Sequence, residues 1–393
     1  MSLAVAATWA ICAGATAGVI GRPFKWPEYV WAVAGAVLLL VSGLLPLGAV
    51  LEAVGKGADV YLFLTGMMLL SEVAREHGLF DWVAATAVIH ARGSRTRLFA
   101  LVYATGIVTT TFLSNDATAV VLTPAVYVAA RKAQAEPLPL LFACALIANA
   151  ASFVLPISNP ANLVLYGGHM PPLGPWMASF ALPSVAAMGV TFLALRWIER
   201  KRIVGDCARD IEREPLSTGG RAALSGIAAT AVLLLVCLLT RRSPVAPIRS
   251  ASWGVMPLVA GLFVLVEALA HTGVIAGIAH HLQTASADPA LTSATAGTLL
   301  ALVSNAVNNL PAGLVASQAI AQAHAPRLVV DGLLIGVDLG PNLSITGSLA
   351  TILWLQAIRR EGEDVGFWAF LKVGAVTMPP TLIAALGTRL LIG

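Results

Sequence analysis

The chain has 393 residues, of which 58% are hydrophobic and only 11% are charged, whereas soluble proteins carry about 25% charged residues. A soluble fold of this length cannot cover so much apolar surface, so part of that surface must face lipid. This composition excludes a cytosolic enzyme, a nucleic-acid-binding protein and a disordered chain. The formal net charge is +4, and we interpret the 24 lysines and arginines as anchors on the cytoplasmic side of a membrane.

Apolar runs of spanning length, about 20 residues, recur along the chain. They occupy residues 2–21, 29–47, 58–76, 175–198, 222–240, 252–270 and 367–392. The first run lacks a basic segment before it, so we expect a first span rather than a cleaved signal. No sustained alternation of polar and apolar residues supports a β-barrel. The prediction is an all-α polytopic membrane protein, because lipid offers the backbone no hydrogen-bond partners.

Two long apolar segments are predicted to be re-entrant helical hairpins. Residues 98–131 would form a straight helix about 51 Å long, well beyond a hydrocarbon core of ~30 Å, and Ser114-Asn115-Asp116 interrupts them. Basic residues flank both ends of this segment, so both ends should be cytoplasmic. Residues 291–323 repeat the design around Asn308-Asn309-Leu310-Pro311. Because no lysine or arginine occurs from residue 250 to 326, the second hairpin should open to the outside.

Each hairpin is followed by a predicted broken transmembrane helix. Residues 138–168 are interrupted by Pro156-Ile157-Ser158-Asn159-Pro160. Residues 328–358 are interrupted by Asp338-Leu339-Gly340-Pro341-Asn342 and by Thr346-Gly347-Ser348. Proline and glycine inside a spanning run break the helix and free backbone polar groups. Such backbone is tolerated at membrane depth only where protein buries it or where it lines a cavity.

An internal repeat divides the chain into two halves. The segment from Gly66 to Gly78 recurs 195 positions later, from Gly261 to Gly273, with a glutamate at the matching place. We therefore expect a first half at residues 1–198, a charged cytoplasmic linker at 199–221 and a second half at 222–393. The flanking charges predict that the halves are inverted repeats, a common transporter plan with binding at the midplane.

The number of crossings between residues 199 and 251 stays open. Basic clusters at Glu199–Arg202 and at Arg241–Arg242 both predict cytoplasmic ends, yet a single run, 222–240, separates them. Either this run is not a full crossing, or another crossing lies near residues 203–221.

Polar residues at the four breaks form the predicted transport site. An ionisable residue at membrane depth is costly and by default functional, so Asp338 and Asp116 are the candidates for proton coupling. A carboxyl group taken out of water favours its neutral form, which suits a proton carrier. The candidates for substrate binding are Asn115, Asp116, Ser158, Asn159, Asn308, Asn309, Asn342, Thr346, Gly347 and Ser348. For each amide and hydroxyl, simple capping of a broken helix is the alternative role.

The other reactive residue types predict no catalytic site, no metal site and no cofactor. No histidine and cysteine set has metal-ligand spacing, and no P-loop motif is present, so we expect neither an enzyme nor an ATPase. Glu72 and Glu267 match between the repeats but lie near span ends, where we favour a role in helix packing. The cysteines are scattered and lie outside the breaks: Cys12, Cys144, Cys207 and Cys237.

The chemistry of the breaks favours some substrates over others. Two carboxylates, with no lysine or arginine close to the breaks in the sequence, disfavour a di- or tricarboxylate anion. They suit a cation, or a small neutral solute rich in hydroxyl groups that is coupled to protons.

Four strings of the sequence resemble the bacterial arsenite/antimonite efflux permeases (ArsB type) of the ion-transporter superfamily. They are residues 112–124, 155–163, 308–311 and 337–354. The most specific is Asp338-Leu-Gly-Pro followed by Gly347-Ser-Leu-Ala-Thr-Ile-Leu-Trp354, whereas the Ser114-Asn115-Asp116 tip is common to the superfamily. The chain lacks a span between Arg241 and Trp253 that the family leads us to expect.

The resemblance implies a multi-pass protein of the bacterial inner membrane that exports trivalent arsenite or antimonite, as the neutral trihydroxide, in exchange for protons. It also implies that the hairpins and broken helices form a moving, elevator-like transport domain. The alternatives are a sodium/proton antiporter of the same superfamily, or a pump subunit whose 199–221 loop docks a cytosolic ATPase. No feature of the sequence supports the ATPase partner.

Overall fold

The computed structural model describes residues 2–167, 170–208, 217–226 and 254–393, and the regular elements within these ranges are helical. In chain order they are α1 (Leu3–Gly21), η1 (Pro23–Lys25), α2 (Glu28–Val41), α3 (Leu47–Lys56), α4 (Ala58–Glu76), α5 (Leu79–Ala91), α6 (Arg95–Phe112), α7 (Asn115–Ala117), η2 (Thr118–Leu122), α8 (Thr123–Lys132), α9 (Pro137–Ala150), η3 (Pro156–Ser158), α10 (Pro160–Tyr166), α11 (Leu173–Ile198), α12 (Thr218–Gly226), α15 (Val255–His271), α16 (Val274–Ala285), α17 (Pro289–Val307), α18 (Asn309–Ala323), α19 (Arg327–Leu339), η5 (Gly340–Asn342), η6 (Ile345–Gly347), α20 (Leu349–Arg360) and α21 (Phe367–Ile392). The all-α prediction is confirmed for this part of the chain.

Helices of spanning length and composition occur in both halves. Within the described ranges four are long and apolar enough to cross a membrane, namely α1, α11, α17 and α21. The number rises to six if the bent pairs α3–α4 and α15–α16 each count as one span. The 367–392 run forms α21 and the 58–76 run forms α4, as predicted. The 29–47 run is not one helix, because α2 ends at Val41 and Gly43 adopts a left-handed conformation with φ of 70°.

Two short helices follow the glycines that the repeat aligns. Gly78 and Gly273 have φ values of 69° and 84°, which end α4 and α15 and begin α5 and α16. Glycine adopts this region without the steric cost that other residues meet. The sequence analysis missed α5 and α16, because with 13 and 12 residues both helices are shorter than a spanning run.

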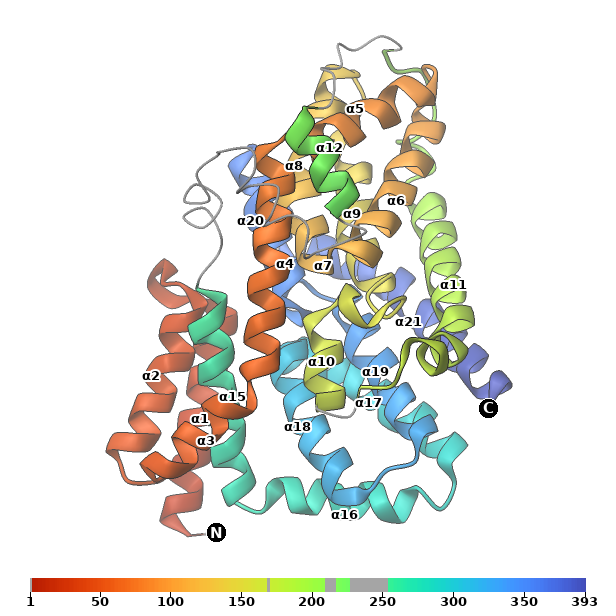
Figure 1. Ribbon diagram of the computed structural model, residues 1–393. Coiled ribbons are helices and arrows are strands. Elements are labelled where there is room, and N and C mark those ends of the chain that lie inside the picture. The colour runs from red at the N-terminus through yellow and green to blue at the C-terminus, as the bar shows by residue number, and fades with distance from the viewer. Residues whose placement is uncertain (1, 168–169, 209–216, 227–253) are drawn as a thin grey trace.

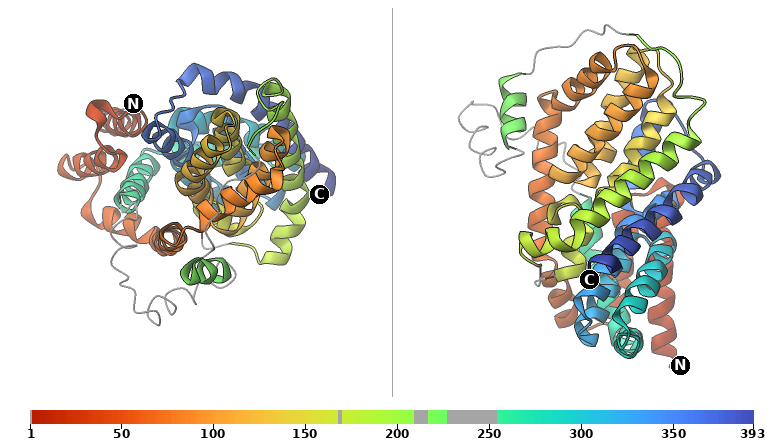
Figure 2. Two further views of the ribbon diagram at one scale, coloured as in Figure 1. Left: turned by 90° about the horizontal axis from the view of Figure 1, so that it is seen from above. Right: turned by 90° about the vertical axis from the view of Figure 1, so that its right-hand side faces the viewer.

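The helices α1, α2, α3 and α15 form a group at one side of the molecule (Figure 1). Seen from above, α1, α2 and α15 lie together at one edge (Figure 2). Small residues allow the close approach, since a Cβ atom on Gly261 would lie 2.8 Å from the Cβ of Ala32. On the other side, the long helices α11 and α21 pack against each other (Figure 2).

Both predicted hairpins are present as helix pairs that open toward opposite ends of the molecule (Figure 1). In the first, α6 ends at Phe112 and the chain returns through α7, η2 and α8. In the second, α17 ends at Val307 and α18 returns directly. The first hairpin opens to the end that carries α5 and α12, and the second to the end that carries α16. This arrangement is the one that inverted repeats would give, and the repeat relationship and membrane re-entrance stay predictions.

Both predicted breaks are interruptions between helices in the structure, while the membrane crossing of these segments and their domain bounds stay predictions. Between α9 and α10 the chain leaves the helical path, and the Asn159 side chain restarts it by accepting a hydrogen bond from the Ala161 backbone N–H (3.0 Å). Between α19 and α20 the Ser348 hydroxyl does the same for the Thr351 N–H (3.1 Å). Capping residues of this kind satisfy the first orphan donors of a helix.

The linker between the halves is partly described. Its first part lies against the open end of the first hairpin, where Arg95 N–H donates to Gly205 O (3.1 Å) and Ser94 pairs with Asp206. The predicted 222–240 run begins within α12, which ends at Gly226. The rest of the run lies outside the described residues. The open question of the crossings between residues 199 and 251 therefore stays open.

Candidate functional site

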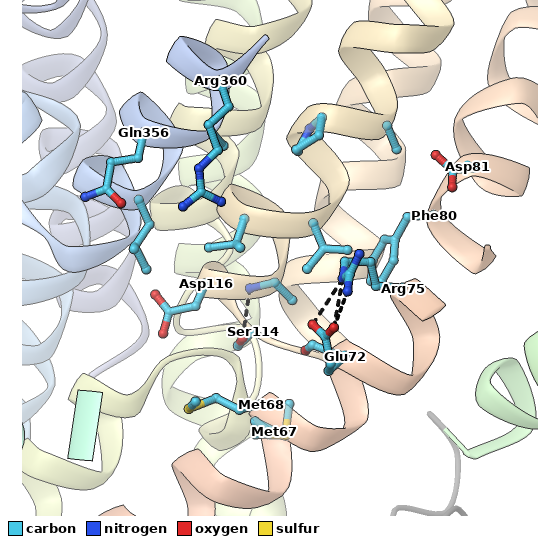
Figure 3. A pocket seen from close by; sticks show the side chains of 18 of the residues that line it. Met67, Met68, Glu72, Arg75, Phe80, Asp81, Ser114, Asp116, Gln356 and Arg360 are labelled. Carbon is cyan, nitrogen blue, oxygen red and sulfur yellow. Dashed lines mark hydrogen bonds and ion pairs between the residues drawn. The ribbon is translucent and has the colours of Figure 1, made fainter. Parts of the chain in front are cut away.

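A cavity of about 560 Å³ lies between α4, the first hairpin and α20. Its apolar wall includes Met67 and Met68 from α4 (Figure 3). The polar side chains that line it are those of Ser71, Glu72, Arg75, Asp81, Ser114, Asp116, Gln356, Arg360 and Glu361. The cavity therefore joins residues from both halves of the chain.

The first hairpin tip faces this cavity. Asp116 is half-buried and its carboxylate points into the cavity (Figure 3). Ser114 is fixed by capping, because its hydroxyl oxygen accepts the Ala117 N–H at 3.1 Å. Asn115 is buried and turns its amide oxygen to the Asp116 N–H (2.9 Å), so it supports the tip rather than lining the cavity. Among the described residues no lysine or arginine forms an ion pair with Asp116.

Two arginines line the cavity together with Asp116. Arg75, on α4, is paired with Glu72 through Nε at 3.0 and 3.1 Å. Arg360, at the end of α20, extends toward the space that Asp116 also faces (Figure 3). The expectation that no lysine or arginine lies close to the breaks does not hold in three dimensions, because Arg75 and Arg360 line the same cavity as Asp116. The electrostatic exclusion of anionic substrates is weakened accordingly.

Asp338 lies deeper than Asp116 and does not line this cavity. It is fully buried, and its Oδ1 accepts a hydrogen bond of 2.7 Å from the Asn159 amide. Its Oδ2 is buried without a hydrogen-bond partner in the described part of the chain. Pro160, which follows Asn159, does line the cavity, so the Asn159–Asp338 pair sits behind the cavity wall. The two broken helices thus meet at a carboxylate with one unsatisfied oxygen.

The second hairpin tip is enclosed by protein. The Asn308 amide donates to the Thr346 carbonyl oxygen (3.2 Å), and its oxygen accepts the Leu310 N–H (3.3 Å). Asn309 is buried, and its amide oxygen has no partner within the described ranges. Asn308 has φ of 74°, a left-handed conformation that places it at the sharp turn between α17 and α18. This tip holds the second broken helix, and the Asn309 oxygen is left free to accept a hydrogen bond.

Several predicted binding residues are already hydrogen-bonded within the protein. Asn342 accepts from the Asn149 amide and donates to Leu146 O, both at 3.0 Å. The Thr346 hydroxyl donates to Asn305 O (3.0 Å), and the Ser348 hydroxyl to Asn149 Oδ1 (3.4 Å). These bonds fasten the breaks together.

Two further predicted residues also support the breaks. The Ser158 hydroxyl donates to Thr111 O at 3.1 Å, which ties the first break to the first hairpin. Gly347 leaves no room for a side chain, because a Cβ there would lie 2.5 Å from Pro341 Cα. A substrate-binding role for these residues stays a prediction.

Sequence reasoning missed two kinds of residue near the breaks. Asn149 and Asn305, which bond the breaks, are single amides inside apolar runs. Asp331 and Arg389 form a buried ion pair with N–O distances of 2.9 and 2.7 Å. A signal for this pair was present, since ionisable residues inside spanning runs are rare and usually paired.

The two repeat-matched glutamates have different surroundings. Glu267, on α15, pairs with Lys56 of α3 at 2.9 Å, which agrees with the helix-packing role expected for it. Glu72 also forms an ion pair, with Arg75, but this pair lines the cavity.

Cysteines and metal-binding clusters are absent from the described cavity. Cys12 and Cys144 are buried elsewhere, Cys207 is half-buried, and Cys237 lies outside the described residues. No group of three or more histidine, cysteine, aspartate or glutamate side chains in the described ranges could hold a metal ion.

Comparisons with known proteins agree with this architecture. A family model described as "Citrate transporter" matches residues 9–339. The chain is 26% identical over 405 residues to the "Arsenical pump membrane protein" of Escherichia coli K12, covering 91% of this chain and 93% of that one. It is 24% identical over 375 residues to an "Uncharacterized transporter" of Mycobacterium tuberculosis, with 83% and 84% covered. Among solved structures, the YdaH transporter of Alcanivorax borkumensis is similar with a TM-score of 0.53 and 14% identity, covering 86% of each chain. The last similarity concerns the fold alone.

Proposed function

This chain belongs to the citrate transporter family and is a multi-pass membrane transporter, and we propose that it exports trivalent arsenite or antimonite, as the neutral trihydroxide, in exchange for protons. The observation that carries the proposal is the cavity at the first hairpin tip, in a chain that aligns with arsenical pump membrane proteins over nine-tenths of its length. We place it in the bacterial inner membrane with the α5/α12 end cytoplasmic, following the basic residues at that end.

Hydroxyl and carboxylate groups at the tip suit a neutral trihydroxide. Asp116 accepts hydrogen bonds from substrate hydroxyls. The Ser114 side chain also lines the cavity and adds a polar contact. No cysteine is needed in the cavity, because a carrier must release its cargo and a thiolate bond to trivalent arsenic would retain it. Binding through hydrogen bonds leaves the substrate exchangeable.

Asp338 is the proposed proton carrier, with Asp116 as the second candidate. Asp338 has one oxygen held by Asn159 and one without a hydrogen-bond partner, so it can take up a proton without breaking an existing bond. The energy is sufficient, since a proton moving down roughly 150 mV releases about 3.5 kcal/mol. At ~1.4 kcal/mol per tenfold, this sustains a gradient of about two and a half decades.

The proposed motion moves both hairpins and both broken helices as one body against α1–α4 and α15. The hydrogen bonds between Asn159 and Asp338 and between Asn149 and Asn342 support this division, because they tie the two broken helices together. An elevator-like movement of this body would carry the tip residues from the cytoplasmic cavity to the opposite side.

The test is arsenite uptake into inside-out membrane vesicles energised by a proton gradient in the absence of ATP. The proposal expects uptake that a protonophore abolishes and that added ATP does not restore. Uptake that requires ATP would contradict it and favour a pump subunit. Sodium-driven proton movement without arsenite uptake would favour a sodium/proton antiporter instead.

A carboxylate anion is the second candidate substrate, favoured by the guanidinium groups of Arg75 and Arg360 in the cavity wall. Arg75 is already paired with Glu72, so Arg360 is the cation with which such an anion would pair. Citrate in the same vesicle assay separates the candidates: transport of citrate but not arsenite would replace the first proposal.

A further inference from the structure

Two polar contacts link α10 to α19 in a regular pattern. Asn159 donates to Asp338 at 2.7 Å, and the Tyr166 hydroxyl donates to Asp331 at 2.5 Å. Asn159 and Tyr166 are seven positions apart, as are Asp331 and Asp338, and the order is reversed between the two helices. Seven residues make two helical turns, about 10.5 Å. Asn159 is the N-cap of α10 and Tyr166 is its last residue, so the two contacts hold opposite ends of α10 against α19, with the two helices antiparallel.

We call Tyr166–Asp331 the outer contact and Asn159–Asp338 the inner contact. The outer contact has more hydrogen-bond partners than the inner one. Asp331 is fully buried, and its second oxygen accepts from Arg389 Nε and Nη2 of α21 at 2.9 and 2.7 Å. Arg327 adds a longer contact of 3.8 Å, and it also donates to Ser179 of α11 at 3.0 Å. A buried carboxylate with a two-point arginine partner has a fixed position. The Tyr166 hydroxyl at the end of α10 is thus bound to a fixed point.

The other side of α19 is packed against backbone. A Cβ on Gly332 would lie 2.6 Å from Ser293 O, and one on Gly340 would lie 2.6 Å from Ala301 Cα, both on α17. The backbones of α19 and α17 are therefore in close contact at these glycines, whereas α10 is a helix of only seven residues. The element whose position needs to be set is therefore α10.

We propose that Tyr166, anchored by the Asp331–Arg389 ion pair, is a positioning residue that fixes α10 along α19 and so keeps the Asn159 amide on Asp338. The proposal rests on the proposed function only in giving Asp338 a role in transport. Loss of the outer contact lets α10 shift, the inner hydrogen bond lengthens, and the ionised form of Asp338 loses a donor.

Few other groups face Asp338, which makes its titration a clean readout. Of the elements packed against α19, neither α17 nor α18 contains a titratable side chain. The remaining titratable groups on these elements are Tyr166 of α10, Cys144 of α9, Lys372 and Arg389 of α21, and Arg327 and Asp331 of α19 itself.

The experiment measures the infrared band of the protonated Asp338 carboxyl group against pH in the purified protein, isolated as the difference between wild type and Asp338→Asn. Asn159→Ala should raise the midpoint by about one pH unit, which corresponds to ~1.4 kcal/mol. Tyr166→Phe should raise it by a smaller amount. In the double variant Tyr166→Phe should add nothing, because the amide through which it acts is gone.

The matched control is Tyr103→Phe. Tyr103 is also buried and its hydroxyl also donates a hydrogen bond, to Met188 O at 2.7 Å, but it lies on α6. This variant should leave the midpoint unchanged.

An unchanged midpoint in Tyr166→Phe would overturn the proposal, and so would additive shifts in the double variant. The absence of any Asp338 band across the accessible pH range would also overturn it. Should Tyr166→Phe not fold, the joint variant Asp331→Asn with Arg389→Gln removes the anchor without leaving an unpaired buried charge, and the same criteria apply. The band does not depend on substrate, so a failure of arsenite transport would reject the proposed function and leave this test valid.

Discussion

The two hairpin tips both carry polar residues within apolar segments but have different environments in the structure. The first tip carries Asp116 into a cavity of about 560 Å³, whereas the second tip is covered by protein and bonded to the second broken helix through Asn308 and Thr346. The tips also differ in charge, since the first carries Asp116 and the second carries the neutral Asn308 and Asn309. One tip is therefore accessible and acidic and the other enclosed and neutral, which indicates that the two tips have distinct roles.

Neutralising Asp338, the buried carboxylate of the second half, should have the largest effect on transport. If the second half supplies the proton carrier, Asp338→Asn should reduce proton-driven arsenite flux in vesicles to background. The amide keeps the size and hydrogen-bonding capacity of the carboxyl group but cannot titrate. The variant should still fold, as judged by size-exclusion chromatography, and its arsenite binding is measured separately. Full pH-dependent transport by this variant would exclude Asp338 as the proton carrier and would assign that role to Asp116, or to Glu72 and Glu267.

The packing of the two hairpins can be compared by adding one methyl group to each half. In the second half, a Cβ on Gly336 would overlap the backbone of Gly297, which cannot move aside. In the first half, a Cβ on Gly106 would lie 2.5 Å from Cγ2 of Ile147, a side chain that can rotate. Gly336→Ala should therefore lower the free energy of unfolding by about 1–3 kcal/mol or more, and Gly106→Ala by clearly less.

Thermal unfolding in detergent measures both glycine variants, with Gly277→Ala as the control. A Cβ on Gly277, in α16, would meet no atom within 4 Å. Equal destabilisation by Gly106→Ala and Gly336→Ala would contradict this prediction, because it would show that both sites accept an added methyl group equally well.

Neutralising Asp116, at the accessible tip, should reduce arsenite flux less than neutralising Asp338. Asp116→Asn is expected to reduce arsenite flux several-fold without abolishing it, because the amide still accepts hydrogen bonds, as the amide of Asn309 at the other tip can. Flux and arsenite binding in the same vesicles check this, and Ser71→Ala, another polar residue of the cavity wall, serves as the comparison. Complete loss of proton coupling in Asp116→Asn would reverse the roles assigned to the two carboxylates.

Sequence reasoning located the hairpin tips and the breaks because their signals are local. Proline, glycine and asparagine inside an apolar run cannot continue an ordinary spanning helix, and the helices end within a few residues of them. The cavity could not be predicted from the sequence, since Arg75 and Arg360, which line it together with Asp116, lie 41 and 244 positions from Asp116 in the chain. Asp331 could have been noticed as a carboxylate in a spanning run, but its partner Arg389 lies 58 positions along the chain. Residue type predicted where structure breaks, and only tertiary packing decided which polar groups face the cavity.

The smallest expected effect concerns the cysteines, and it tests whether the cavity alone recognises the cargo. Cys12 and Cys144 are buried away from the cavity, and Cys207 lies in the linker against the first hairpin. A variant in which these three and Cys237 are all replaced by serine or alanine should export arsenite at the wild-type rate. Trivalent arsenic binds thiols strongly, so a transport mechanism through cysteine would lose its activity completely in this variant. The measurement is vesicle uptake at several arsenite concentrations, with protein amount and monodispersity matched to wild type. A folded, inserted cysteine-free protein that no longer transports arsenite would contradict recognition through the hydroxyl and carboxylate groups of the first tip.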